Sequence, residues 1–178
     1  MDTIKLVVTK NCNRSCSGCC NKDHDIDSLP IFDSDYFKKH KKEIKNIIIT
    51  GGEPLLYQKK LSQLMINFLD YKDIKFILYT AYVKDYFKNI GILSFFDGIT
   101  LTLHEQSDIS DAMEFLFKIK QYNMKNKTFF LNVFEGIDLT EIHDILDNWK
   151  VRTGYKWIKD CPLPKNEILM RLPKFLEE

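Results

Sequence analysis

The sequence predicts an α/β protein whose parallel strands form an open, partial (β/α)6 barrel of the TIM type. Two observations carry this prediction. Short β-branched and apolar runs alternate along the 178 residues with longer segments whose apolar residues recur at helical spacing. About six such β–α units are present, and six are too few to close a barrel that normally takes eight, so the barrel is expected to stay open.

The strands are expected where β-branched and apolar residues gather in short runs. These runs are residues 3–9, 46–50, 74–79, 98–104, 128–134 and 155–159. In 98–104 the residues alternate, so Ile99, Leu101 and Leu103 are expected to face the helices. The opposite set, Thr100, Thr102 and His104, then faces the barrel interior, where a polar ligand can reach it.

The helices are expected between the strands, where apolar residues return every three or four positions. Asp33 or Ser34 can cap the first helix, which runs to about Ile44. The other helices are marked by Leu61, Leu64, Met65, Phe68 and Leu69; by Tyr82, Tyr86 and Phe87; by Met113, Leu116, Phe117 and Ile119; and by Ile142, Ile145, Leu146 and Trp149. No repeat or linker divides the chain, so a single domain over 1–178 is expected, with a peripheral tail from about residue 161.

Charge and hydropathy exclude several classes of protein. With 26 basic and 25 acidic residues the net charge is +1, which gives no electrostatic case for binding nucleic acid, and the basic run at 38–42 is interpreted as a solvated helix face. No apolar run reaches the ~18 residues that a membrane-spanning helix needs. With no export signal and with clustered free thiols, the chain is expected in the reducing cytoplasm.

The most informative stretch is a loop rich in cysteine. Four of the five cysteines lie within it, directly after the first expected strand, and three of them read Cys12-x3-Cys16-x2-Cys19. In parallel α/β folds, the carboxyl ends of the strands are where ligands bind. Three thiolates on an iron–sulfur cubane leave the fourth iron open to a small molecule. The loop therefore predicts a 4Fe–4S cluster with an open site.

Disulfide bonds and a zinc site are the two other uses that clustered cysteines can have. Disulfides in clusters of this kind belong mainly to small secreted domains, whereas this chain is of ordinary size and has no signal peptide. A zinc site is the stronger alternative, with His24 as a fourth ligand. Structural zinc usually takes two short ligand pairs separated by a longer spacer, and no second pair follows here. A non-catalytic zinc-binding interaction protein remains the alternative from a different functional class.

The second motif is Gly51-Gly52-Glu53-Pro54, which follows the second expected strand. The two glycines permit positive φ angles and close approach of the backbone to a ligand. Glu53 offers a carboxylate, and Pro54 stiffens the exit from the turn. Because neighbouring parallel strands end at the same edge, this turn is expected to lie beside the cysteine loop.

Together, the two motifs and the order of the elements resemble the radical S-adenosylmethionine enzymes over about residues 3–160. The resemblance implies that Cys12, Cys16 and Cys19 ligate a 4Fe–4S cluster. It also implies that Gly51, Gly52 and Glu53, with Pro54 in the same turn, contact S-adenosylmethionine. In that family, an electron from the reduced cluster cleaves S-adenosylmethionine to methionine and a 5′-deoxyadenosyl radical, which abstracts hydrogen. A flavodoxin or ferredoxin would be the electron donor.

Within that superfamily, the run Cys16-x-Gly18-Cys19-x-Asn21 resembles the activating enzymes of anaerobic ribonucleotide reductase. Many radical enzymes carry an aromatic residue where Gly18 stands. Members of the subgroup often have an aromatic residue in place of Cys20 and a Thr-Trp pair, which this chain lacks. The resemblance implies a glycyl-radical enzyme as partner and substrate, and a peptide or a small molecule is the alternative substrate.

Several further residues are candidates for lesser roles. Thr102 and His104 are placed to touch S-adenosylmethionine or the substrate, and Asn132 and Glu135 are in the region of the ribose. Cys20 is interpreted as a spare thiol near the cluster, and Cys161 as structural or free. The remaining acidic residues are interpreted as helix starts or solvated faces; they are Asp108, Asp111, Glu141 and Asp144.

Overall fold

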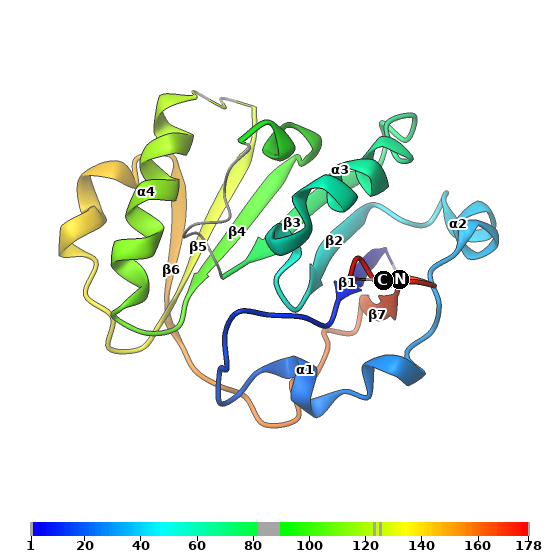
Figure 1. Cartoon of the computed structure of the whole chain (residues 1–178), viewed down its shortest axis with the longest axis horizontal. Coiled ribbons are helices and arrows are strands. Elements are labelled where there is room, and N and C mark those ends of the chain that lie inside the picture. Colours follow the sequence, from blue (N-terminus) through cyan, green and yellow to red (C-terminus); the bar gives the residue numbers. More distant parts are fainter. Residues whose placement is uncertain (1, 82–89, 123, 125, 178) are drawn as a thin grey trace.

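The computed structural model describes residues 2–81, 90–122, 124 and 126–177, and its centre is one sheet of seven strands (Figure 1). The strand order is β6-β5-β4-β3-β2-β1-β7, and every neighbouring pair is parallel. The strands are β1 (Thr3–Thr9), β2 (Asn46–Gly51), β3 (Lys75–Thr80), β4 (Gly98–Leu103), β5 (Thr128–Phe134), β6 (Trp149–Tyr155) and β7 (Glu167–Arg171).

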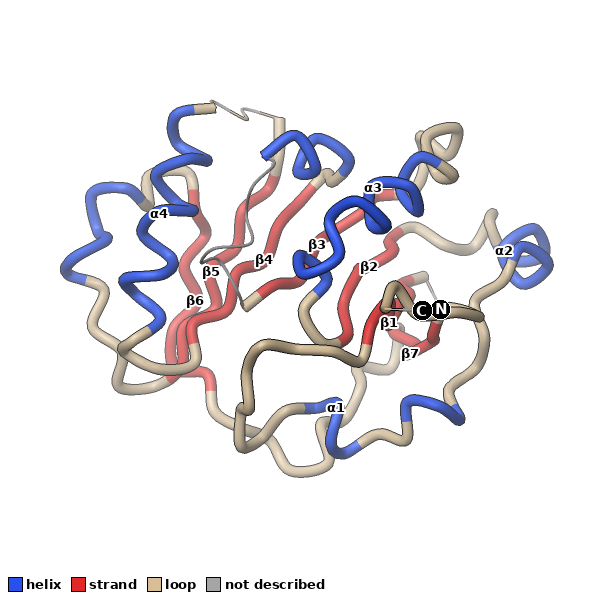
Figure 2. The backbone as a smooth tube through the Cα atoms, viewed as in Figure 1, coloured by secondary structure: helices blue, strands red, loops and turns tan. Residues whose placement is uncertain are grey.

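Helices connect the strands, and Figure 2 shows α3 and α4 over the same side of the sheet. The α-helices are α1 (Cys20–Asp23), α2 (Ser34–His40), α3 (Gln58–Ile66) and α4 (Asp108–Gln121). Short 3-10 helices are η1 (Ile26–Ser28), η2 (Pro54–Tyr57), η3 (Ile90–Phe95) and η4 (Thr140–Ile145). The Asp33 carboxylate accepts hydrogen bonds from the backbone N–H groups of Asp35 and Tyr36, so the expected cap of α2 is confirmed.

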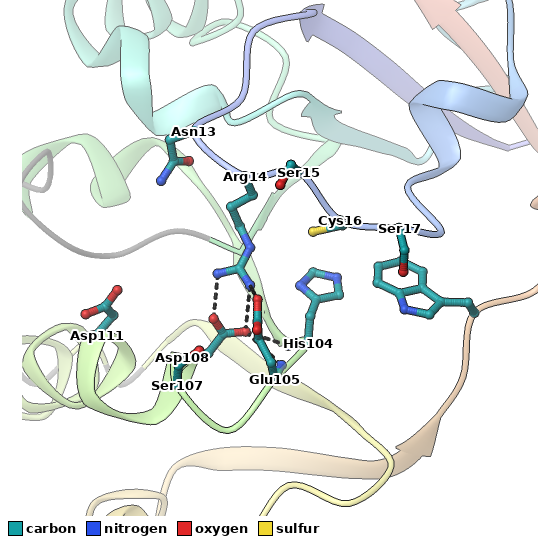
Figure 3. Close-up of a pocket in the computed structure, with 11 residues that line it drawn as sticks. Asn13, Arg14, Ser15, Cys16, Ser17, His104, Glu105, Ser107, Asp108 and Asp111 are labelled. Atoms are coloured by element: carbon teal, nitrogen blue, oxygen red, sulfur yellow. Dashed lines mark hydrogen bonds and ion pairs between the residues drawn. The ribbon is translucent and has the colours of Figure 1, made fainter.

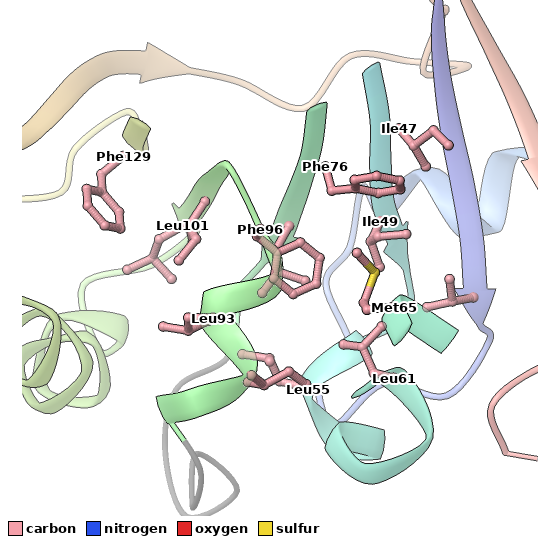
Figure 4. Packing of buried hydrophobic residues seen from close by; sticks show 14 of the residues in the cluster. Ile47, Ile49, Leu55, Leu61, Met65, Phe76, Leu93, Phe96, Leu101 and Phe129 are labelled. Atoms are coloured by element: carbon pink, nitrogen blue, oxygen red, sulfur yellow. The ribbon is translucent and has the colours of Figure 1, made fainter. Parts of the chain in front are cut away.

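The hydrophobic core lies between the sheet and these helices (Figure 4). Leu61 and Met65 of α3 are buried in the same cluster as Ile49 of β2. The alternation expected in β4 is confirmed on this face, because Ile99, Leu101 and Leu103 are all fully buried in the core. The alternate residues of each strand, among them Thr102, therefore point to the opposite, concave face.

The sheet is open and curved, as the partial barrel predicts. Figure 1 shows β6 and β7 at opposite ends of the sheet, and they do not pair. Burial raises the pKa of Tyr79 on the central strand β3, and Glu167 of β7 raises it further, while Arg152 of β6 lowers it.

The last third of the chain differs from expectation. The sixth strand is residues 149–155, not 155–159, and the helix expected around Ile142–Trp149 is the short η4. The tail expected to be peripheral instead supplies β7, which pairs with β1, and Met170 and Leu176 are buried in the core. The tail was misjudged because β7 depends on a partner strand over 160 residues earlier in the chain.

Two further expectations concern helices. The helix marked by Tyr82, Tyr86 and Phe87 falls outside the described residues. Among the described residues, no helix has the length and apolar character needed to cross a membrane.

Candidate functional site

The cysteine loop and the Gly-Gly turn line one cavity of about 230 Å³ at the carboxyl ends of the strands. Cys12, Cys16 and Cys19 contribute from the loop after β1, and Gly51 and Gly52 from the turn after β2. The concave face of the sheet closes the cavity with Thr50, Tyr79, Thr102 and His104. The structure therefore brings together most of the residues singled out in the sequence.

Backbone hydrogen bonds hold the two loops together. The Gly52 N–H donates to the Thr9 carbonyl at 2.7 Å, and the Glu53 N–H donates to the Asn11 carbonyl at 2.8 Å. A Cβ atom on Gly52 would lie 1.9 Å from the Asn11 carbonyl oxygen. Gly51 has φ +125°, and a Cβ there would lie 2.4 Å from the Thr9 oxygen. Both glycines are thus required by the close approach of the cysteine loop.

Glu53 is buried behind the turn, with 1% of its surface exposed. Its carboxylate accepts hydrogen bonds from the Leu55 N–H at 3.0 Å, the Thr80 hydroxyl at 2.9 Å and the Ala81 N–H at 3.1 Å. Pro54 is also buried and begins η2. These contacts fix the turn against the end of β3, so Glu53 shapes the cavity wall from behind, and its contact with S-adenosylmethionine stays a prediction.

The three cavity cysteines are free, and thiolates are the donors that hold an iron–sulfur cluster, so the residues present fit that group. Among the described residues, no group of three His, Cys, Asp or Glu side chains is arranged to hold one metal ion. His24, the candidate fourth zinc ligand, lies with its Nε2 3.2 Å from the Cys161 carbonyl oxygen.

The protonation of Cys12 is set by its surroundings. Although part of the residue is exposed, desolvation raises the pKa of the Cys12 thiol, the backbone N–H of Arg14 lowers it, and the charge of Glu53 raises it again. The net result is a pKa above the ordinary thiol value. Because iron binds the thiolate, loading of the loop must release this proton.

A buried ion pair ties the cysteine loop to the start of α4 (Figure 3). Arg14 donates to both carboxylate oxygens of Asp108, at 2.6 and 3.0 Å, and to Glu105 at 3.2 Å. Asp108 also accepts from the backbone N–H groups of His104 and Glu105. Burial lowers the pKa of Arg14, but its hydrogen bonds and charge interactions with Asp108 and Cys16 together more than compensate, so the pKa lies above its usual value.

Sequence reasoning missed Arg14 and the ion pair that Asp108 forms with it. Asp108 does start a helix, as expected, but it is 5% exposed and does not lie on a solvated face. The available signal was the position of Arg14 between two candidate ligands, Cys12 and Cys16, where a cation needs an acidic partner.

Trp157, which follows β6, covers the cysteine loop from the other side. Its ring stacks on His104, with centroids 5.0 Å apart and planes 3° apart. A Cβ atom on Gly18 would lie 2.6 Å from the Trp157 ring, so only glycine fits beneath it. Burial, and then the charge of Arg14, lower the pKa of His104 to about 4. Packing against Trp157 therefore explains why residue 18 is a glycine in this chain.

A second cavity of about 530 Å³ adjoins the first (Figure 3). The two share Arg14, Cys16, His104 and Trp157 in their walls. Ser15, Ser107 and Glu105 make the second cavity polar. A molecule placed in it would lie directly beside the cysteine-lined cavity.

Cys20 and Cys161 form a disulfide, which corrects the interpretation of Cys20 as a spare thiol and agrees with the structural alternative given for Cys161. The bond joins residues 141 positions apart and fixes the β6–β7 connection, which carries Trp157, to the cysteine loop. Sequence reasoning weighed disulfides only within the cluster of cysteines. This pairing escaped it because the fold alone brings Cys161 to the loop.

Two candidates lie away from the first cavity. Asn132 is 8% exposed on β5 and is not among the residues that line it. Glu135 follows the same strand and forms an ion pair with Lys156 at 3.0 Å. Their suggested contacts with the ribose stay predictions.

Comparison with known proteins supports the iron–sulfur interpretation. The family model described as a 4Fe-4S single cluster domain matches residues 3–115. A search of curated proteins gives no match.

Among solved structures, SuiB of Streptococcus suis shares the fold. Its crystal structure bound to S-adenosylmethionine matches with a TM-score of 0.56 and 16% identity, over 90% of this chain and 40% of SuiB. The crystal structure of SuiB bound to the precursor peptide SuiA matches with a TM-score of 0.58 and 17% identity, over 86% of this chain and 39% of SuiB. This chain therefore spans less than half the length of SuiB in those two structures, and at such identity the likeness concerns the fold.

Proposed function

Because this chain belongs to the 4Fe-4S single cluster domain family and to the radical S-adenosylmethionine superfamily, we propose that it is an enzyme that cleaves S-adenosylmethionine reductively. When bound, the reduced 4Fe–4S cluster supplies the electron that converts S-adenosylmethionine to methionine and a hydrogen-abstracting 5′-deoxyadenosyl radical. The residues proposed to hold the cluster are Cys12, Cys16 and Cys19.

One observation carries this proposal: three free thiols and a Gly-Gly turn face one cavity, with their loops joined by backbone hydrogen bonds. Gly51 and Gly52 let the turn lie close against the cysteine loop, and Glu53 and Pro54 hold the turn in place. Thr102 and His104 face the same space from the sheet. SuiB, which has this fold, was crystallised with S-adenosylmethionine.

We further propose that the substrate is a peptide segment. Support comes from the 530 Å³ cavity beside the cysteines and from the complex of SuiB with its precursor peptide. Trp157 and the Cys20–Cys161 bond keep the cysteine loop covered on one side, so the substrate is expected to enter from the second cavity. A donor of the flavodoxin or ferredoxin type would reduce the cluster.

Activation of a glycyl-radical enzyme is the second candidate. It is supported by the run Cys16-x-Gly18-Cys19-x-Asn21. In this chain, however, packing of Trp157 on Gly18 already explains the glycine. Peptide modification is therefore preferred, and incubation with a glycyl-radical partner enzyme tests the alternative by the appearance of a stable backbone radical in electron paramagnetic resonance.

The central test is anaerobic reconstitution with iron and sulfide. The protein should turn brown, bind about four irons per chain and release 5′-deoxyadenosine from S-adenosylmethionine and dithionite. Cys12→Ala should abolish the cleavage, while Cys20→Ala should keep most of the iron. Colourless, zinc-loaded protein that yields no deoxyadenosine would contradict the proposal and favour the zinc-binding alternative.

A further inference from the structure

Two cations stand on the concave face of the edge strand β6 without an acidic partner. The guanidinium of Arg152 lies 3.8 Å from the centre of the Phe130 ring, and the Lys150 ammonium lies 5.5 Å from it. Within the described part of the chain, neither forms an ion pair. By contrast, Lys156 pairs with Glu135 at 3.0 Å, and Lys5 pairs with Glu167 at 2.7 Å.

Contact with the Phe130 ring lowers the cost of ordering these cations when a ligand binds. A guanidinium held flat against an aromatic ring has lost part of its water and of its rotational freedom. Such an arrangement costs less to order on binding than a free surface arginine.

Arg152 lies in the same row of paired residues across the sheet as Thr102, which lines the cysteine-lined cavity. Thr102 of β4 lines that cavity, Thr102 is paired in register with Asn132 of β5, and Asn132 is paired with Arg152 of β6. All three residues point to the concave face. With neighbouring strands ~4.8 Å apart, the Arg152 backbone is about 10 Å from that of Thr102.

The surface between the two is polar. Asn132 is 8% exposed, and its side-chain oxygen has no hydrogen-bond partner among the described residues. Tyr79, another residue lining the cavity, is near enough to Arg152 for that charge to lower its pKa. A ligand extending from the cavity toward β6 would therefore cross Asn132 and end at the two cations.

We propose that Arg152, with Lys150 beside it, is an anion site that binds a carboxylate of the substrate, namely an acidic side chain of the peptide. The inference rests on the proposed function and adds the chemical class of its substrate. The planar guanidinium matches a carboxylate through two parallel hydrogen bonds, which a lysine alone cannot supply. The carboxylate of S-adenosylmethionine is a second possible source of such a group, and the experiment distinguishes the two sources.

The test compares two synthetic peptides that are identical except that one carries glutamates where the other carries glutamines. Binding to the reconstituted protein with S-adenosylmethionine is measured by fluorescence anisotropy. The glutamate peptide should bind roughly tenfold more tightly, and the difference should shrink as salt is raised. Arg152→Gln should abolish the preference, and Arg152→Lys should restore part of it.

Lys118→Gln is the matched control, because it removes one positive charge from α4, on the other side of the sheet, where Lys118 pairs with Glu114. It should keep the preference. Equal binding of the two peptides to the unmodified protein would overturn the proposal. So would Arg152→Gln if it weakened S-adenosylmethionine binding in equilibrium dialysis and left the peptide preference intact. Failure of the proposed function is distinct, because it shows as absent deoxyadenosine whatever the peptide result.

Discussion

At the scale of single residues, Gly52 decides how closely the two motif loops can approach. An added Cβ would meet the Asn11 carbonyl oxygen at 1.9 Å, so the backbone of the cysteine loop would have to move. Gly52→Ala should lower the stability by about 1–3 kcal/mol, the usual cost of overpacking, and should reduce iron uptake. Urea unfolding and iron analysis measure both effects.

Gly136→Ala is the control for this prediction. Gly136 has φ +86°, but a Cβ there meets nothing within 4 Å. This variant should show only the cost of backbone strain, about 1 kcal/mol, with normal iron uptake. Equal iron loss in both variants would show that the close contact at Gly52 does not matter.

His104 gives the protein a defined sensitivity to acid. Its folded pKa of about 4 lies below the unfolded value near 6.5, so the unfolded chain binds the proton more tightly. Stability should therefore be unaffected by this group above about pH 6.5 and should fall as the pH drops toward 4. In the cluster-free protein, His104→Gln should remove this part of the decline. Unfolding midpoints at pH 7.5 and pH 5 provide the comparison, and an unchanged decline would contradict it.

At the scale of elements, one ion pair positions the cysteine loop against α4. The side chains of Arg14 and Asp108 are only 15% and 6% exposed, so removing one charge leaves the other buried. Asp108→Asn should cost on the order of 3 kcal/mol. The double variant Arg14→Gln with Asp108→Asn should be less destabilised than the sum of the single variants. Unfolding free energies of all four proteins give the coupling, and strict additivity would rule it out.

The elements also show what sequence reasoning can reach. The β1 and β5 strands were predicted with their observed bounds because each is a short run of mostly β-branched, aromatic and apolar residues, most of them buried. By contrast, β6 is an edge strand whose residues after Trp149 are exposed, so it carries no apolar pattern. The order and parallel direction of the first five strands follow from the alternation of elements, but β7 follows only from pairing with β1.

The candidate site divides in the same way. The cysteines and the Gly-Gly turn carry their own chemistry, so their sequence spacing was enough to identify them. Arg14 and Asp108 are 94 residues apart, and Trp157 meets Gly18 only after the whole sheet has formed. Contacts of this kind form only in the tertiary fold, and no local sequence pattern predicts them.

At the scale of the whole molecule, the Cys20–Cys161 bond should make stability depend on redox conditions. Closing 141 residues restricts the unfolded chain by up to roughly 5 kcal/mol in the chain-entropy model. Dithiothreitol should therefore lower the Tm of the cluster-free protein. Cys161→Ser should lower it by a similar amount and make it indifferent to the reductant. A Tm of the unmodified protein that does not respond to dithiothreitol would contradict this expectation.

The same bond turns most of the chain into a covalent ring with two short arms. Cys12, Cys16 and Cys19 lie on the N-terminal arm, whereas Gly52, His104 and Arg152 lie within the ring. A single cut by a protease inside the ring would leave the pieces joined, and they would migrate as one band until a reductant is added. The arm that carries Cys12, Cys16 and Cys19 is thus covalently tied to the β6–β7 connection, which carries Trp157.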